Sequence, residues 1–105
     1  MIKFLKNLFT GKGKEEMMEA LKNGAEIIDV RSEGEFSGGH LKGSKNIPLP
    51  KIVDQIDKIK KQNKVVILCC ASGMRSAQAT SILKSNGIKA YNGGSWYSVQ
   101  KLMEK

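Results

Sequence analysis

The chain has 105 residues, which is enough for one domain and too few for two of ordinary size. It carries 18 Lys and Arg against 10 Asp and Glu, a net charge of +8 that favours anionic partners in general. Aromatic residues make up 6% and no nucleic-acid-reading motif occurs, so we expect no nucleic-acid partner. No stretch approaches the ~20 apolar residues of a membrane span, so no transmembrane segment is expected.

The first 14 residues, MIKFLKNLFTGKGK, precede the first predicted helix. We predict an N-terminal arm at residues 1–13 and a single domain at 14–105. Ile2, Leu5 and Phe9 fall on one face of a helix, but a signal peptide needs a longer apolar core and a cleavage site. Two interpretations stay open: the arm packs on the domain, or it contacts an anionic membrane surface.

Strands and helices alternate along the rest of the chain. Strands are predicted at residues 26–30, 44–47, 65–70 and 88–92. Helices are predicted at residues 15–23, 51–61, 76–85 and 95–103, and residues 32–42 are predicted to be irregular. This alternation predicts an α/β protein with three layers, in which a mainly parallel central sheet of four to five strands has helices on both faces.

The stretch VVILCCASGMRS is the candidate functional site. The six apolar residues Val65–Cys70 are typical of a strand buried on both faces, and small residues up to Gly73 allow a tight loop. Loop amides that lead into a helix N-terminus favour an anion and lower the pKa of a thiol. We therefore expect Cys70 to be an exposed, ionised nucleophile, with Arg75 and the loop amides receiving negative charge.

The two cysteines, Cys69 and Cys70, are adjacent, so they form no disulfide framework. Such cysteine usage suits a reducing compartment, and we expect a cytoplasmic protein. The single His has no second ligand in motif spacing and no CxxC pair occurs, so we expect no metal and no cofactor.

Three blocks of sequence resemble one known family. The first consists of Ile28–Arg31, Glu35-Phe36 and Gly39–Leu41; the second of Gly43 and Asn46–Pro48; the third of Cys70–Ser76 with Gly93-Gly94 and Trp96 after it. In this order, over residues 27–96, they resemble a single-domain rhodanese, a sulfurtransferase with a rhodanese-like fold. Related phosphatases and arsenate reductases have five residues between cysteine and arginine. Here four separate Cys70 from Arg75, which favours a smaller cradle for a single sulfur.

The resemblance implies a ping-pong reaction through a persulfide on Cys70. A donor such as thiosulfate, a persulfide or a polysulfide supplies the sulfur, and a thiol or cyanide accepts it; a sulfur-relay protein is an alternative partner. It also implies that the substrate is held by the loop residues Ala71, Ser72, Gly73, Met74 and Arg75. For Arg75 the alternative is a structural salt bridge with a nearby acid. The supporting residues that it implies are Asp29, Arg31, His40, Ser76 and Trp96.

Several of these residues have two interpretations. Asp29 and Arg31 form either a buried brace or an electrostatic wall of the pocket, and Trp96 either anchors the last helix or lines the substrate mouth. His40 is either structural or an acid–base group. Cys69, on the other face of the strand, either packs in the core or acts as a resolving thiol.

One loop position departs from the family. The residue after the nucleophile is often basic, and here it is Ala71, which removes a cation that could hold thiosulfate. This departure favours a persulfide or polysulfide donor, or a protein partner. It also motivates the alternative that the chain is a sulfur carrier or interaction module with little turnover.

Overall fold

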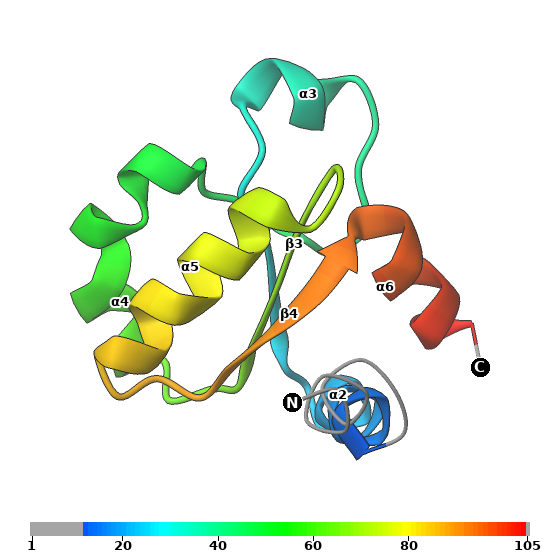
Figure 1. Ribbon diagram of the computed structural model, residues 1–105, viewed down its shortest axis with the longest axis horizontal. Helices are drawn as coiled ribbons and strands as arrows, with labels where there is room; N and C mark the ends of the chain where they lie inside the picture. Colours follow the sequence, from blue (N-terminus) through cyan, green and yellow to red (C-terminus); the bar gives the residue numbers. More distant parts are fainter. Residues whose placement is uncertain (1–11, 105) are drawn as a thin grey trace, which may run out of the picture.

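The computed structural model describes residues 12–104. Its centre is a four-stranded sheet in the order β2-β1-β3-β4, in which every neighbouring pair is parallel (Figure 1). The strands are β1 (Glu26–Asp29), β2 (Lys45–Asn46), β3 (Val66–Cys70) and β4 (Ala90–Ser95). The predicted parallel sheet of four to five strands is confirmed, and β3 is one of its two central strands.

Helices cover both faces of this sheet, as predicted. One face packs against α4 (Ile56–Lys61) and α5 (Met74–Ser85), and the other against α2 (Lys12–Lys22) and α6 (Trp96–Met103) (Figure 1). All five residues of β3 are buried because each face of that strand has its own core. Leu68 and Cys70 pack on the α4–α5 side, and Ile67 and Cys69 on the α2–α6 side.

The stretch predicted to be irregular, residues 32–42, contains a short helix, α3 (Glu33–Ser37). Ser32 caps it: its side chain accepts from the Glu35 N–H, and the Glu35 side chain accepts from the Ser32 N–H in return. Such a capping box stabilises even one turn and a half of helix, which the glycines around it conceal in the sequence pattern.

The helix predicted at residues 51–61 is shorter than expected. Two 3-10 turns, η1 (Leu49–Lys51) and η2 (Val53–Gln55), precede α4. Pro50 lies in the first of these turns, where its fixed φ and missing N–H suit a tight turn rather than a regular helix. Ile52 and Ile59 are nevertheless buried in the core, so this segment still packs on the sheet.

The last strand begins and ends later than predicted, at residues 90–95 instead of 88–92. The glycine pair therefore lies within β4 and not after it. Leu68 pairs with Asn92, but Cys69 pairs with Gly94, so Gly93 is an extra residue in a bulge. A Cβ on Gly93 would lie 2.5 Å from Val99 Cγ2, which shows how closely α6 packs against this part of the sheet.

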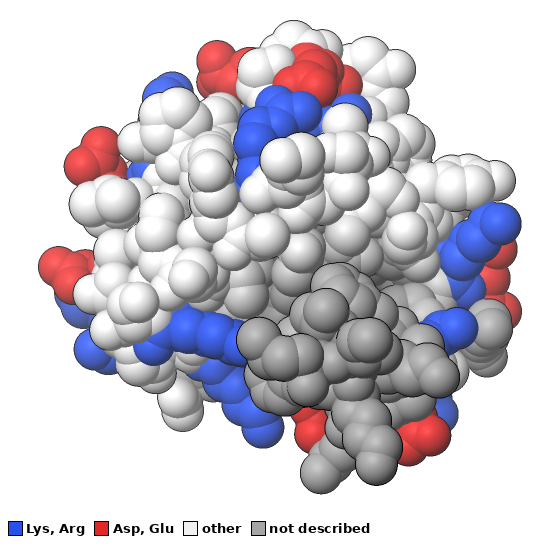
Figure 2. Space-filling view, viewed as in Figure 1, with Lys and Arg blue, Asp and Glu red and all other residues white. Residues whose placement is uncertain are grey.

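Charge is unevenly distributed over the surface. Figure 2 shows that the face over α5 and β4 is mostly uncharged, with lysines at its margins. In residues 74–83 and 90–100, Arg75 is the single charged residue. The helices described for residues 12–104 are all too short or too polar to span a lipid bilayer. The predicted arm lies almost wholly outside the described residues, so the boundary at residue 13 stays a prediction.

Candidate active site

The loop that follows Cys70 lies at the carboxyl ends of the parallel strands. It leaves β3, rises between α3 and the beginning of α6, and enters α5 (Figure 1). Ligands of open α/β sheets bind at this edge. Gly73 makes the turn possible, because its φ of +99° is one that side-chain-bearing residues rarely adopt.

Backbone and hydroxyl groups surround the Cys70 sulfur. The Gly73 N–H donates to Sγ at 3.0 Å, and the Ser76 hydroxyl oxygen lies 3.4 Å from it. Burial by itself raises the pKa of the Cys70 thiol, but hydrogen bonds from the Ser76 hydroxyl and from the backbone of Ser76, Gly73 and Ser72 outweigh burial. The pKa of Cys70 is therefore lower than that of an ordinary thiol, which favours the thiolate.

The expectation that Cys70 is exposed is wrong. Its residue surface is 0% accessible, because the loop amides that bind the sulfur also cover it. The loop residues Ala71, Ser72 and Met74 beside it are themselves exposed to solvent. The Cys70 sulfur is therefore buried next to an exposed loop.

Asn92 of β4 braces the loop from the side. Its Nδ2 donates to the Gly73 carbonyl oxygen at 3.2 Å, and its Oδ1 accepts from the Ser76 hydroxyl at 2.6 Å. Its Oδ1 also accepts from the Gly94 N–H at 3.0 Å. One amide therefore ties the end of β4 to both sides of the loop. Sequence reasoning missed Asn92, although a polar residue just before a glycine pair at a strand end was an available signal.

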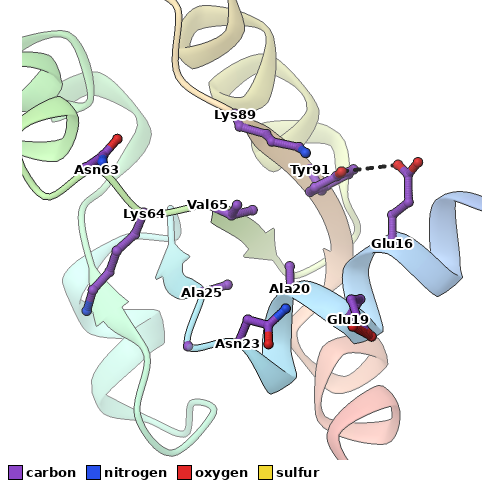
Figure 3. A pocket seen from close by; sticks show the side chains of 11 residues that line it. Glu16, Glu19, Ala20, Asn23, Ala25, Asn63, Lys64, Val65, Lys89 and Tyr91 are labelled. Atoms are coloured by element: carbon purple, nitrogen blue, oxygen red, sulfur yellow. Dashed lines mark hydrogen bonds between the residues drawn. The ribbon is translucent and has the colours of Figure 1, made fainter.

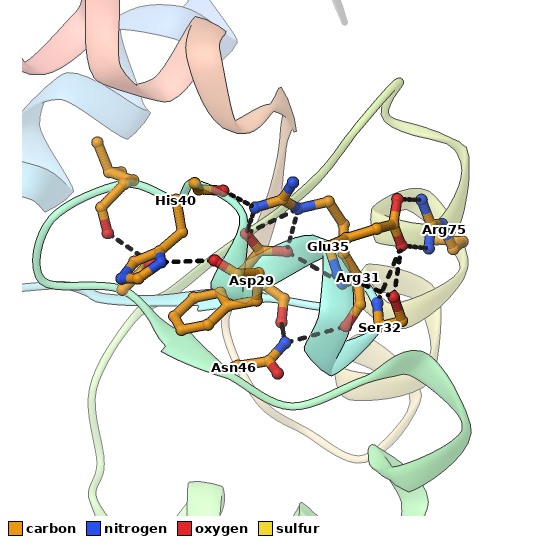
Figure 4. A network of polar contacts seen from close by, with 11 residues as sticks. Asp29, Arg31, Ser32, Glu35, His40, Asn46 and Arg75 are labelled. Carbon is orange, nitrogen blue, oxygen red and sulfur yellow. Dashed lines mark hydrogen bonds and ion pairs between the residues drawn. The ribbon is translucent and has the colours of Figure 1, made fainter.

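The Arg75 side chain pairs with Glu35 of α3 (Figure 4). The two groups form parallel hydrogen bonds, Nη1–Oε1 at 2.7 Å and Nη2–Oε2 at 3.0 Å. Arg75, together with the Ser32 backbone, lowers the pKa of Glu35 to about 2, so the carboxylate stays ionised. Glu35 was assigned no role from the sequence. Its charge, opposite to that of Arg75, was the signal that could have indicated this ion pair.

A second ion pair is buried beneath this one. Asp29 is fully buried, and Arg31 binds it through Nη2 at 2.9 Å and through Nε, while the Arg31 backbone N–H also donates to Asp29 (Figure 4). Arg31 further donates to the Gly39 carbonyl oxygen at 2.7 Å and lies over the Trp96 ring, 5.3 Å from its centroid. This cluster joins the end of β1 to the connection after α3 and to α6.

Comparison with known proteins decides the family. Residues 13–98 match the Rhodanese-like domain family. This chain belongs to that family. The crystal structure of a rhodanese-like domain protein from Staphylococcus aureus is similar to it, with a TM-score of 0.67 and 32% identity, over 81% of this chain and 85% of that chain.

Two curated relatives of this rhodanese-like chain are longer proteins. The uncharacterized protein YqhL of Bacillus subtilis is 40% identical over 73 residues, which cover 70% of this chain and 57% of YqhL. The tRNA sulfurtransferase of Thermoplasma acidophilum is 34% identical over 67 residues, which cover 64% of this chain and 13% of that protein. The chain thus spans only part of the length of these relatives, among which is a sulfurtransferase.

His40 and Cys69, which also had two interpretations, lie apart from the Cys70 sulfur of the rhodanese-like loop. His40 is exposed, stacks on Phe36 with ring centroids 3.7 Å apart, and its Nδ1 lies 2.7 Å from the Phe36 carbonyl oxygen. Cys69 is buried on the opposite face of β3, and burial, then the charge of Asp29, raises its pKa to about 12. Neither group is placed to exchange a proton with Cys70 in this conformation.

A cavity lies at the other end of the sheet (Figure 3). It has a volume of about 410 Å³ and lies between α2 and the residues that lead into β3 and β4. Tyr91 donates to Glu16 at its rim, at 3.1 Å. Among the described residues no cysteine lines it, so it offers no thiol nucleophile.

Proposed function

We propose that this chain is a sulfurtransferase that carries a sulfane sulfur as a persulfide on Cys70. The observation that carries the proposal is the ring of donors on one sulfur atom: the Gly73 N–H at 3.0 Å, with further hydrogen bonds from Ser72 and Ser76. Such donors stabilise a thiolate, and equally a persulfide anion, without a separate proton-transfer residue. Its free cysteines suit a reducing compartment, and we place the reaction in the cytoplasm.

The proposed reaction has two displacements at sulfur. The Cys70 thiolate attacks the outer sulfur of a donor persulfide, the new Sγ–S bond forms, the donor S–S bond breaks, and the donor leaves as a thiolate. An acceptor thiolate then attacks the outer sulfur on Cys70, which takes back its electron pair as a thiolate. Charge and atoms balance in both steps, and the leaving groups need no proton.

The surroundings of the loop support a persulfide or polysulfide donor over thiosulfate. Arg75 is the one cation of the loop, and Glu35 neutralises it through two hydrogen bonds. Ala71 supplies no second cation, and the face over α5 and β4 is mostly uncharged (Figure 2). A dianion such as thiosulfate gains little electrostatic attraction there. A persulfide carried by a small thiol or by a protein depends less on such attraction for binding.

Intact mass spectrometry tests the proposal directly. The chain is incubated with glutathione persulfide or with thiosulfate, and we expect one sulfur atom to be added and then removed by reductant. The C70S variant should gain none, while the matched C69S variant should gain as much as the wild type. Equal labelling of C70S would refute the assignment.

A second candidate function is a sulfur carrier with little turnover. The inaccessibility of the Cys70 sulfur favours it, because a persulfide under a closed loop is protected from small acceptors. It predicts a persulfide that forms but persists when glutathione or cyanide is added. Rapid multiple turnover with either acceptor would show that the chain is an enzyme. A persulfide that persists in the presence of both acceptors would show that it is a carrier.

A further inference from the structure

The side-chain amide of Asn92 has only one possible orientation. Its Nδ2 faces the Gly73 carbonyl oxygen at 3.2 Å and its Oδ1 faces the Gly94 N–H at 3.0 Å. Because a carbonyl only accepts and an N–H only donates, these two partners identify the oxygen of the amide. Asn92 therefore presents an acceptor, never a donor, to the Ser76 oxygen that lies 2.6 Å away.

Ser76 has one hydroxyl proton and two neighbours that compete for it. Its oxygen lies 2.6 Å from Asn92 Oδ1 and 3.4 Å from Cys70 Sγ. While Cys70 is a thiol, its S–H can donate to Ser76, and the Ser76 hydroxyl donates to Asn92. A thiolate has no proton to give, so the Ser76 hydroxyl stabilises it only by turning from Asn92 toward the sulfur.

We propose that Asn92 is a positioning residue that competes with the Cys70 thiolate for the Ser76 hydroxyl proton and so sets how readily Cys70 ionises. The inference deepens the proposed function and rests on the role of Cys70 given there. On ionisation the Cys70 proton passes to solvent, and the hydroxyl proton stays on Ser76 and changes direction only. The Gly94 N–H still occupies Asn92 Oδ1, so that oxygen keeps a donor in both states.

The bulge in β4 holds these groups in place. Asn92 pairs with Leu68, so its side chain lies on the same face of the sheet as Cys70 and α5. Because Gly93 is the extra residue, Gly94 takes the next position opposite Cys69, and its N–H points back to the Asn92 side chain. The orientation of the Asn92 amide thus depends on the bulge in the β4 backbone and not on another side chain that could move.

Charged groups surround the cluster but do not take part in the competition. Arg75 of α5 is paired with Glu35 of α3, and Asp29 at the end of β1 is paired with Arg31. Residues 92–95 of β4 include no titratable side chain. These charges act on Cys70 equally in every variant compared below, so they cancel in the comparison.

A double-mutant cycle on the ionisation of Cys70 tests the inference. The rate of alkylation by iodoacetamide is measured against pH for the wild type, S76A, N92A and the double variant. We expect S76A to raise the midpoint by about one pH unit, because the thiolate loses a donor. N92A should lower the midpoint because the hydroxyl is free to turn, and should have no effect in the S76A background.

An equal shift from N92A in both backgrounds, or a raised midpoint in N92A alone, would overturn the inference. Thermal unfolding shows whether each variant is folded. If N92A does not fold, the nearly isosteric N92D variant is measured instead. A carboxylate holds the Ser76 hydroxyl proton more strongly than the amide does. N92D should therefore raise the alkylation midpoint more when Ser76 is present than in the S76A background. Alkylation needs no sulfur donor, so its result is separate from the mass test of the proposed function.

Discussion

Arg75 and Glu35 lie 40 positions apart in the sequence and meet through two parallel hydrogen bonds of 2.7 and 3.0 Å. The pair joins the beginning of α5 to α3, one on each side of the Cys70 loop. Its consequence is electrostatic, because the loop's one cation is neutralised before any substrate arrives. If the chain acts as proposed, we expect the choice of sulfur donor to depend on Glu35 as much as on Arg75.

The variant E35Q is expected to raise kcat/KM for thiosulfate by about two- to fivefold relative to a persulfide donor, the range that a freed surface charge supports. Gln at this position preserves the capping box with Ser32. Acidification to pH 5 does not have the same effect, since the pKa of Glu35 is about 2. Steady-state kinetics with both donors measure the ratio.

The matched control is R75Q, which removes the cation instead of its partner. It should lower the ratio of thiosulfate to persulfide activity, or leave it unchanged if Glu35 already neutralises Arg75 completely. An E35Q variant whose two activities change by the same factor would show that the pair holds the loop and does not select the donor.

The two adjacent cysteines are expected to differ sharply toward alkylating reagents. Cys70 should react with a pH midpoint below about 8.5, the value of an ordinary thiol, because hydrogen bonds lower its pKa. Cys69 should stay unlabelled in the folded protein, because its pKa is about 12 and it packs in the core on the α2–α6 side, whereas Cys70 lies beside the exposed loop. Peptide mapping after timed labelling measures both, and the urea-unfolded chain, in which both cysteines react, is the control.

The same two thiols should give opposite dependences of stability on pH. The folded-state pKa of Cys69 is raised, so its contribution is full below about pH 8.5 and is lost toward pH 12, by at most about 1.4 kcal/mol per pH unit. The folded-state pKa of Cys70 is lowered, so its contribution is full above about pH 8.5 and is lost as pH falls through the folded pKa.

Urea unfolding of the wild type, C69A and C70A between about pH 6 and 10 isolates these contributions from the titrating lysines, which all three proteins share. The free energy of unfolding of the wild type minus that of C69A should fall as the pH rises above about 8.5. The free energy of unfolding of the wild type minus that of C70A should rise with pH over the neutral range. Parallel curves for all three proteins would contradict both assignments.

The sequence allowed the sheet, and the strand that ends at Cys70, to be predicted because both follow from local patterns. A run of apolar residues ending at Cys70 predicts a central strand, and the small residues after it predict a loop. The capping box of α3 was equally local, with Ser32 and Glu35 three residues apart, but the glycines around it concealed it.

Features that depend on packing could not be predicted in this way. The bulge at Gly93 of β4, opposite Leu68 and Cys69, lies where α6 packs so closely that a side chain on Gly93 would clash with Val99. It shifts β4 by one residue and sets Asn92 beside the loop. Likewise the accessibility of Cys70 depends on how tightly the loop closes over it, which the identity of the loop residues does not determine.

The buried pair of Asp29 and Arg31 is expected to matter far more for stability than the partly exposed pair that joins β1 to β2. The variant R31M leaves the Asp29 carboxylate buried with the Arg31 backbone N–H but without the guanidinium, and should lower the free energy of unfolding by about 3 kcal/mol. The control is K45M, which removes the half-exposed partner of Glu26 and should cost below about 1 kcal/mol. Equal losses in urea unfolding would mean that the buried pair is no brace.

Gly93 is expected to be the glycine that least tolerates a methyl group. In G93A the new Cβ would lie 2.5 Å from Val99 Cγ2 and 3.0 Å from Ile67 Cγ2, so α6 has to move away from the sheet, at a cost of about 1–3 kcal/mol in the free energy of unfolding. The control G34A adds the same methyl group on exposed α3, where nothing lies within 4 Å, and should leave stability unchanged or slightly raised. Because Asn92 precedes Gly93, the G93A variant should also shift the alkylation midpoint of Cys70, whereas G34A should not. Urea unfolding and alkylation of the two variants measure this, and a G93A protein as stable as G34A would show that the bulge can relax without moving α6.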